Sequence, residues 1–100
     1  MSYRVALTPA ARDDLIAIRD WIAVEAQSYE VADGYVNRIK ARIGTLADFP
    51  GRGSPRVDLG PDFRSLAFER RRTIIYRIEG DVVRILRVLD ASRDLGLVFG

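Results

Sequence analysis

The hydrophobic pattern of this chain changes from a helical to a strand period near Pro50-Gly51, and that change decides the fold class. Before it, apolar residues recur at every third or fourth position, as in amphipathic helices. From Phe63 onward, apolar and polar residues alternate, as in strands with one buried face. A short alternating segment, residues 3 to 7, precedes the helical part. We therefore predict an α+β fold, in which a helical hairpin covers one face of a sheet.

The two helices are expected over residues 8 to 26 and 28 to 49, each beginning at a hydroxyl residue that can accept from free N–H groups. The link between them is so short that they must form an antiparallel hairpin. Gly34 and Gly44 lower helix propensity, so we expect them where packed backbones approach closely. Trp21 lies beside the first apolar stripe and is expected to pack at the edge of the core.

The strands are expected at residues 63 to 68, 74 to 78 and 82 to 89, after a loop at 51 to 61 that is rich in glycine and proline. The last strand is apolar on both faces, which predicts a central strand covered on both sides. The helical hairpin can cover one face. Residues 95 to 99 either fold back over the other face or leave it for a partner.

Length and composition exclude several classes of protein. One hundred residues, 48% of them hydrophobic, suit a single domain over residues 1–100. The chain has no cysteine and no histidine, so we expect no catalytic residue, no metal site and no cofactor. The formal charge of +2 is compatible with an ordinary soluble surface, and we expect no direct, specific nucleic-acid binding. No segment has the length of a signal peptide or a membrane span, so we expect a cytoplasmic protein and no membrane contact.

Several short segments, in their order and spacing, resemble one family along nearly the whole chain. They are Thr8-Pro9-Ala10-Ala11, Asp14-Leu15, Ile18, Phe49-Pro50, Leu59-Gly60, Arg64-Ser65, Ile75-Tyr76-Arg77, Val88-Leu89 and Ser92-Arg93-Asp94-Leu95. In these features the chain resembles the ParE toxins of type II toxin-antitoxin modules, within the RelE/ParE superfamily. The resemblance implies a helical hairpin packed on a twisted antiparallel sheet. It also implies a bacterial toxin that inhibits DNA gyrase and is neutralised by a ParD-like antitoxin.

The candidate binding residues are mostly arginines, which offer planar charged groups to carboxylates. The residues expected to bind the antitoxin are Arg64, Arg77, Arg84, Leu86, Arg87 and Arg93. The residues expected to contact the target are Arg70, Arg71, Arg72 and Phe99, the three arginines forming an exposed turn. Tyr76 is expected in the core, with its hydroxyl at the rim of the sheet.

Two alternative functions remain open. A RelE-like ribosome-dependent ribonuclease needs a route for proton transfer, and here no tyrosine follows Tyr76 while Asp90 stands where many superfamily members have a histidine-like group. A carboxylate there would repel a phosphate unless an arginine neutralised it. We therefore expect a toxin that is not an enzyme. The second alternative is a non-toxic module that only binds an antitoxin.

Overall fold

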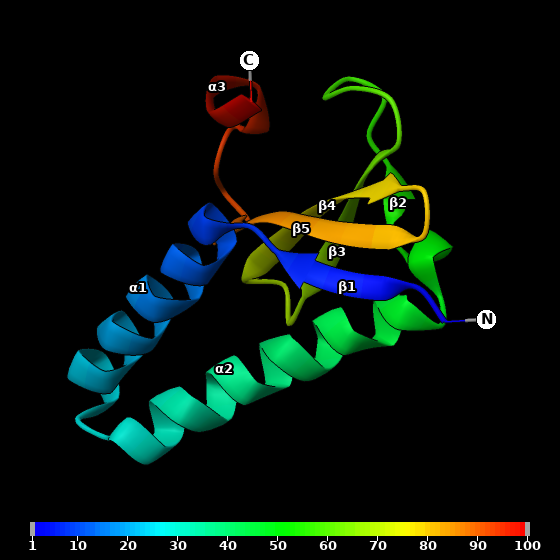
Figure 1. Ribbon diagram of the computed structural model, residues 1–100. Helices are drawn as coiled ribbons and strands as arrows, with labels where there is room; N and C mark the ends of the chain where they lie inside the picture. The colour runs from blue at the N-terminus through cyan, green and yellow to red at the C-terminus, as the bar shows by residue number, and fades with distance from the viewer. Residues whose placement is uncertain (1, 100) are drawn as a thin grey trace.

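The computed structural model describes residues 2–99 and places two helices against a five-stranded sheet (Figure 1). The helices are α1 (Pro9–Ala26), α2 (Tyr29–Gly44) and the short α3 (Leu95–Phe99). The strands are β1 (Arg4–Leu7), β2 (Ser54–Pro55), β3 (Phe63–Phe68), β4 (Arg72–Glu79) and β5 (Val82–Asp90). Two single 3-10 turns, Thr45–Ala47 and Pro50–Arg52, connect α2 to β2. The α+β prediction is confirmed.

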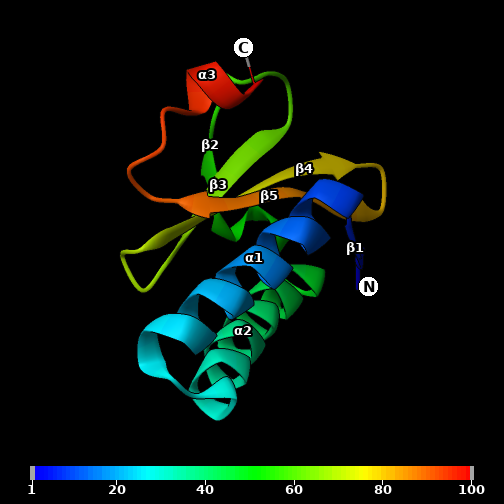
Figure 2. The same ribbon diagram turned by 90° about the vertical axis from the view of Figure 1, so that its left-hand side faces the viewer.

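Side-chain caps begin both long helices, as the sequence predicts. The Ala11 N–H donates to the Thr8 hydroxyl at 3.1 Å, and the Val31 N–H donates to the Ser28 hydroxyl at 3.2 Å. Gln27 ends α1 in the left-handed conformation, with φ at 52°. Its backbone lets the chain reverse within two residues, so α1 and α2 pack as the predicted antiparallel hairpin (Figure 2).

The sheet order is β1-β5-β4-β3-β2, so β5 is an interior strand, as predicted. Four strands are antiparallel neighbours, whereas β1 pairs parallel to β5 with Arg4 opposite Val82. Alternation alone does not reveal the direction of a neighbouring strand, so this parallel pair could not be predicted from it. The predicted loop at 51 to 61 was also too long, because it contains the two-residue strand β2.

A β-bulge in β5 changes which residues face the core. Ile75 lies opposite Arg87 and the next residue, Tyr76, lies opposite Ile85, which leaves Leu86 as an extra residue. Counting alternate residues therefore assigns the faces of this strand wrongly on one side of the bulge. On the two sides of the bulge, Val83, Ile85 and Val88 all belong to the main core cluster.

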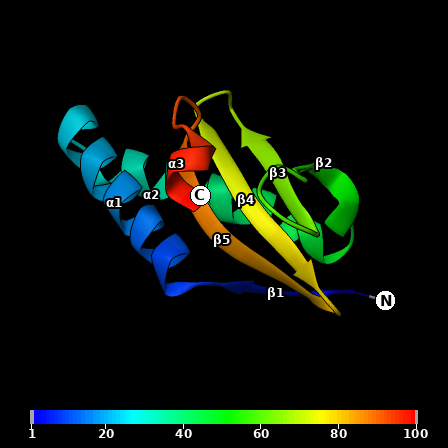
Figure 3. The ribbon, with the colours of Figure 1, turned by 90° about the horizontal axis from the view of Figure 1, so that it is seen from above.

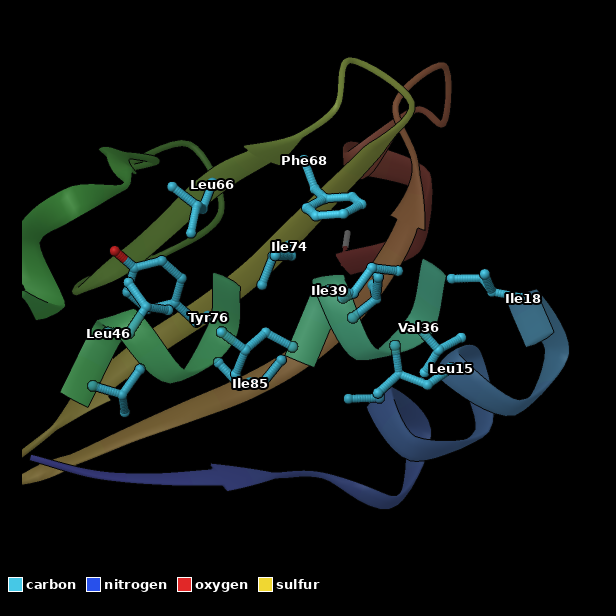
Figure 4. Packing of buried hydrophobic residues seen from close by; sticks show 14 residues of the cluster. Leu15, Ile18, Val36, Ile39, Leu46, Leu66, Phe68, Ile74, Tyr76 and Ile85 are labelled. Atoms are coloured by element: carbon cyan, nitrogen blue, oxygen red, sulfur yellow. The ribbon is translucent and has the colours of Figure 1, made fainter. Parts of the chain in front are cut away.

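The core lies between α2, the inner face of α1 and one face of the sheet (Figure 4). Phe49 is 62% exposed, because the apolar stripe of α2 ends at the fully buried Leu46, so the predicted extension of the stripe is wrong. Gly34 and Gly44 have no atom within 4 Å of a built Cβ, so the expected close approach there is also wrong. The close approach is at Gly53, where a Cβ would lie 2.7 Å from the Tyr76 hydroxyl.

Among residues 2–99, no helix is both long enough and apolar enough to cross a lipid bilayer.

Candidate functional site

Two arginines face each other on the side of the sheet away from α2. Arg77 of β4 lies directly opposite Arg84 of β5, and the residues flanking each of them pack in or against the core cluster. Like charges at such positions destabilise a sheet unless neighbours compensate them. Glu79 accepts a hydrogen bond from Arg84 (Nε···Oε1 3.0 Å), and the Arg77 guanidinium lies 5.7 Å from the centre of the Phe63 ring. The pair forms a half-buried cationic site on an open face.

The short helix α3 stands on the same side of the sheet, opposite α2 (Figures 1 and 3). Its Phe99 ring meets the Phe63 ring edge-on, with centroids 6.0 Å apart. No described residue of α3 is buried, and Leu97 is 86% exposed. Of the two possibilities for residues 95 to 99, folding back is observed. Phe99 lies beside Phe63, the ring that the Arg77 guanidinium also contacts. Contact of Phe99 with a target stays a prediction.

Arg87 is engaged inside the fold by Asp14 of α1. The Asp14 carboxylate accepts from Arg87 Nε at 2.8 Å and Nη2 at 2.9 Å, and from the Val88 N–H at 2.9 Å. Because β1 ends at Leu7, this part of β5 has no neighbouring strand on the β1 side, and Asp14 accepts from the free edge N–H there. The hydrogen bond to Asp14 raises the pKa of Arg87. Asp14 therefore joins α1 to the sheet.

Arg64 is also engaged inside the fold, together with the Tyr76 hydroxyl. Arg64 donates to the Gly53 carbonyl at 2.7 Å. The Tyr76 hydroxyl donates to the Pro50 carbonyl at 2.7 Å and accepts from the Gly53 N–H at 2.8 Å. Tyr76 is fully buried, which confirms its predicted place in the core, and burial raises its pKa. The two side chains fix the segment that leads into β2.

The remaining predicted antitoxin residues lie apart from one another. Leu86 is the half-buried bulge residue, and its carbonyl accepts from the Thr8 hydroxyl at 2.9 Å. Arg93 is exposed in the segment between β5 and α3. The structure thus brings Arg77 and Arg84 together, but it separates them from Arg64, Arg87 and Arg93. Antitoxin binding by each of these residues stays a prediction.

The predicted turn of three arginines contains two. Arg70 and Arg71 are exposed at the β3–β4 turn, where Glu69 and Arg70 have positive φ of 47° and 62°. Arg72 is the first residue of β4, and its Nη1 lies 3.8 Å from Asp90 of β5. Hydrogen bonds from the Ser92 hydroxyl and N–H, with smaller contributions from the nearby arginines, lower the pKa of Asp90. Asp90 therefore stays ionised and neutralises part of this charge.

Two surface features escaped the sequence analysis. Trp21, expected at the core edge, is 55% exposed and borders shallow hollows beside the β3–β4 turn. A separate apolar groove runs between α1 and α2. Its lining consists of Leu7, Leu15, Ile16 and Val36, with Arg12, Arg19 and Lys40 as cationic residues. Ile16 is an apolar residue outside the core stripe of α1. Its presence there was the one sign in the sequence of an apolar groove on the surface.

The described side chains offer charge stabilisation more readily than proton transfer. On the arginine face the carboxylate Glu79 is bonded to Arg84, and the Tyr76 hydroxyl points to the other side of the sheet. Within residues 2–99 no three acidic side chains gather in a way that could hold a metal ion. The arrangement can bind an anion at Arg77 and Arg84 and apolar groups in the groove between the helices.

Comparison with known proteins decides the family. The family model for the ParE toxin of the type II toxin-antitoxin system parDE matches residues 5–95. The chain belongs to the ParE toxin family. Toxin ParE3 of Caulobacter vibrioides is 34% identical over 76 residues, which cover 76% of this chain and 75% of that protein. The predicted resemblance is therefore confirmed.

Solved toxin-antitoxin structures share the fold. A chain of the chromosomal ParDE system from P. aeruginosa superimposes with a TM-score of 0.78 at 27% identity, covering 91% of this chain and 98% of that one. A chain of the RelBE2 complex from Mycobacterium tuberculosis gives a TM-score of 0.62 at 24% identity, covering 90% and 99%. The second likeness concerns the fold alone. The ParE toxin described here is thus the toxin of a type II module, and its partner is an antitoxin.

Proposed function

We propose that this ParE toxin inhibits DNA gyrase in the bacterial cytoplasm by binding it, without bond-breaking chemistry of its own. The observation that carries the proposal is the arginine pair Arg77–Arg84, which has charge but no free proton-transfer group beside it. Cleavage of RNA by its own 2′-hydroxyl requires removal of a proton as well as stabilisation of charge. A surface that can stabilise charge but cannot remove a proton is suited to binding.

We further propose that a ParD-like antitoxin neutralises the toxin by occupying the groove between α1 and α2 and the arginine face. The groove offers apolar walls at Leu15, Ile16 and Val36 with cationic residues beside them. An antitoxin segment with aliphatic and acidic side chains complements both features. Membership in the ParE family and the likeness to a chain of a ParDE system support a ParD-like partner.

The target is tested with purified toxin in two parallel assays. Supercoiling by purified gyrase should fall with increasing toxin, and added antitoxin should restore it. Messenger RNA on translating ribosomes should stay intact at the same toxin concentrations. Ribosome-dependent cleavage with unaffected gyrase would overturn the proposal.

One observation favours the ribonuclease as the second candidate. Arg77 and Arg84 lie close enough in register to stabilise the negative charge of a pentavalent phosphate together. Under this alternative, Arg84→Ala abolishes RNA cleavage. Under the proposed function, the wild-type toxin cleaves no RNA, so this substitution changes nothing in the cleavage assay. A wild-type toxin that does not arrest growth would indicate the non-toxic module.

The antitoxin surface is tested by charge reversal. Arg84→Glu places a carboxylate on the arginine face and should weaken the complex at least tenfold in calorimetry. Arg52→Glu is the matched control, since Arg52 is exposed on the 3-10 turn before β2. Equal affinity of the two variants, with equal melting temperatures, would place the interface elsewhere.

A further inference from the structure

Trp21 forms a wall shared by three adjoining shallow hollows at one end of the molecule. One hollow is lined by Arg72 and Asp90 together with residues of α1, and the second by the arginines of the β3–β4 turn with Asp90. The third lies against Tyr35 of α2, with Arg71 and Arg72 beside it. A half-exposed tryptophan next to arginines is typical of residues that dominate binding energy at interfaces.

The third hollow contains two buried donors that lack an acceptor. Among residues 2–99, the buried side-chain atoms without a hydrogen-bond partner are the Tyr35 hydroxyl oxygen and Arg72 Nε. Both residues line the hollow below Trp21. Buried polar groups in folded proteins normally have partners, so Tyr35 and Arg72 would gain hydrogen bonds if an occupant of the hollow turned these side chains toward it. A carboxylate offers two acceptor oxygens and suits both.

The charge around these hollows is positive and partly unpaired. Some arginines at the surface are paired, as in Arg38 with Glu69 and Arg56 with Asp58. Arg70 and Arg71 take part in no ion pair within residues 2–99. Asp90 lies 3.8 Å from Arg72 and accepts a hydrogen bond from Ser92, so this single carboxylate neutralises only part of the charge of the three arginines. An occupant with negative charge complements this surface.

We propose that the Trp21 hollows, lined by Trp21, Tyr35, Arg70, Arg71 and Arg72, dock an acidic segment of the target protein. A carboxylate of that segment meets the exposed Arg70 and Arg71, and a neighbouring apolar side chain lies on the exposed Trp21 ring. The inference rests on the proposed function, because it assigns the surface to the target. The closing experiment separates the failure of one from the failure of the other.

A protein segment fits this site better than a nucleic-acid backbone. Nucleic acids are held by a track of cations along many phosphates. Here the acidic residues Glu25 and Asp90 line the same hollows and would repel a continuous phosphate chain. A short carboxylate-bearing segment with an apolar neighbour needs only one local site.

The Trp21 hollows lie on the side of α1 opposite the groove assigned to the antitoxin. Groove residues Arg12, Ile16 and Arg19 share one helical face, whereas Trp21 and Glu25 lie about half a turn of the helix away. A substitution at Trp21 therefore affects the target surface while leaving the antitoxin groove intact. This separation makes the proposal testable.

The experiment compares Trp21→Ala, Arg71→Glu and the control Arg52→Glu in three measurements. Both hollow variants should require at least ten times more toxin than wild type for half-inhibition of gyrase supercoiling, and should fail to arrest growth at wild-type expression. Antitoxin affinity and melting temperature should match those of wild type and of Arg52→Glu. Hollow variants that inhibit gyrase and arrest growth as wild type does would overturn the site.

Two further outcomes are informative. If wild type arrests growth but leaves gyrase active, the proposed function fails. The proposed site then stands if Trp21→Ala and Arg71→Glu no longer arrest growth, and it fails if they still do. Trp21 is the single tryptophan of the chain, so its fluorescence reports on the site directly. Salt-sensitive quenching by a single-stranded oligonucleotide, abolished by Arg71→Glu, would overturn the protein assignment in favour of nucleic acid.

Discussion

Arginine is used in opposite ways in two regions near the C-terminal end of β5. Where α1 meets β5, Arg87 is held by two hydrogen bonds to Asp14, and the same carboxylate closes the free edge of the strand. Arg70 and Arg71 are exposed at the β3–β4 turn, near Asp90 at the end of β5. They form no ion pair within residues 2–99. The first arrangement stabilises the fold. The second leaves charge available for a partner.

This difference teaches that arginine content alone does not define an interface. Sequence reasoning grouped Arg64, Arg77, Arg84 and Arg87 because all four lie in strands. Arg64 and Arg87 instead satisfy backbone or side-chain groups of the same chain. Substitutions of paired polar groups should therefore lower stability, whereas those of unpaired ones should change binding. Four predictions test this division, beginning with the largest expected effect.

Asp14→Ala should destabilise the protein most. The change leaves Arg87 without its carboxylate and the Val88 N–H without its acceptor, at a cost of about 2–4 kcal/mol in the free energy of unfolding. Urea denaturation measures this loss. Asp13→Ala is the matched control, since Asp13 is exposed and should change stability by less than about 0.5 kcal/mol. Equal effects of the two variants would break the comparison.

The fully buried Tyr76 and the partly buried Tyr35 give the next test. Tyr76→Phe removes the partner of the Gly53 N–H and of the Pro50 carbonyl, so stability should fall by about 1–3 kcal/mol. Tyr35→Phe removes a hydroxyl that has no partner in the structure and should be neutral or slightly stabilising. Thermal denaturation of both variants measures the contrast. A Tyr35→Phe loss as large as that of Tyr76→Phe would mean that the Tyr35 hydroxyl is satisfied in solution.

The helix α3 should show a smaller effect. Phe99→Ala removes the edge-on contact with Phe63 and should cost about 0.5–1.5 kcal/mol. Leu97→Ala should leave the melting temperature unchanged, because Leu97 is almost fully exposed. Equal melting temperatures for wild type and Phe99→Ala would indicate that α3 does not hold to the sheet.

Arg71→Glu should have the smallest effect on folding. Arg71 is exposed and unpaired, so the free energy of unfolding should change by no more than about 0.5 kcal/mol. Urea denaturation checks this value alongside the binding assays. A loss near that of Asp14→Ala would show that Arg71 belongs to the internally paired arginines.

Local features of the fold were predictable from sequence because they depend on neighbouring residues. The caps at Thr8 and Ser28 and the changes of period needed no knowledge of distant contacts. The parallel pairing of β1 and the bulge at Leu86 depend on segments far apart in the chain, so alternation could not reveal them. From sequence alone, Leu86 could face either side of the sheet, because only the pairing of β5 with β4 shows that it is the bulge residue.

The site was predictable only in part for the same reason. Asp14 lies three residues after Ala11 and four before Ile18, so the apolar stripe itself placed it beside the core. That signal was available, but its partner Arg87 lies 73 residues away. Trp21 follows Ile18 by three residues, yet it is exposed because the end of the hairpin extends beyond the sheet (Figure 2).

The parallel pairing of β1 with β5 also sets the order in which the chain can be completed. Arg4 cannot pair with Val82 until Val82 has been synthesised. At a translation rate of about 5–20 residues per second, roughly 4–16 seconds separate the two residues. Contacts between such distant segments form late in folding, after the cost of closing the intervening loop. During synthesis the helices therefore exist before the sheet that gives them a partner. The groove between α1 and α2 can therefore form before the arginine face, which needs both β4 and β5.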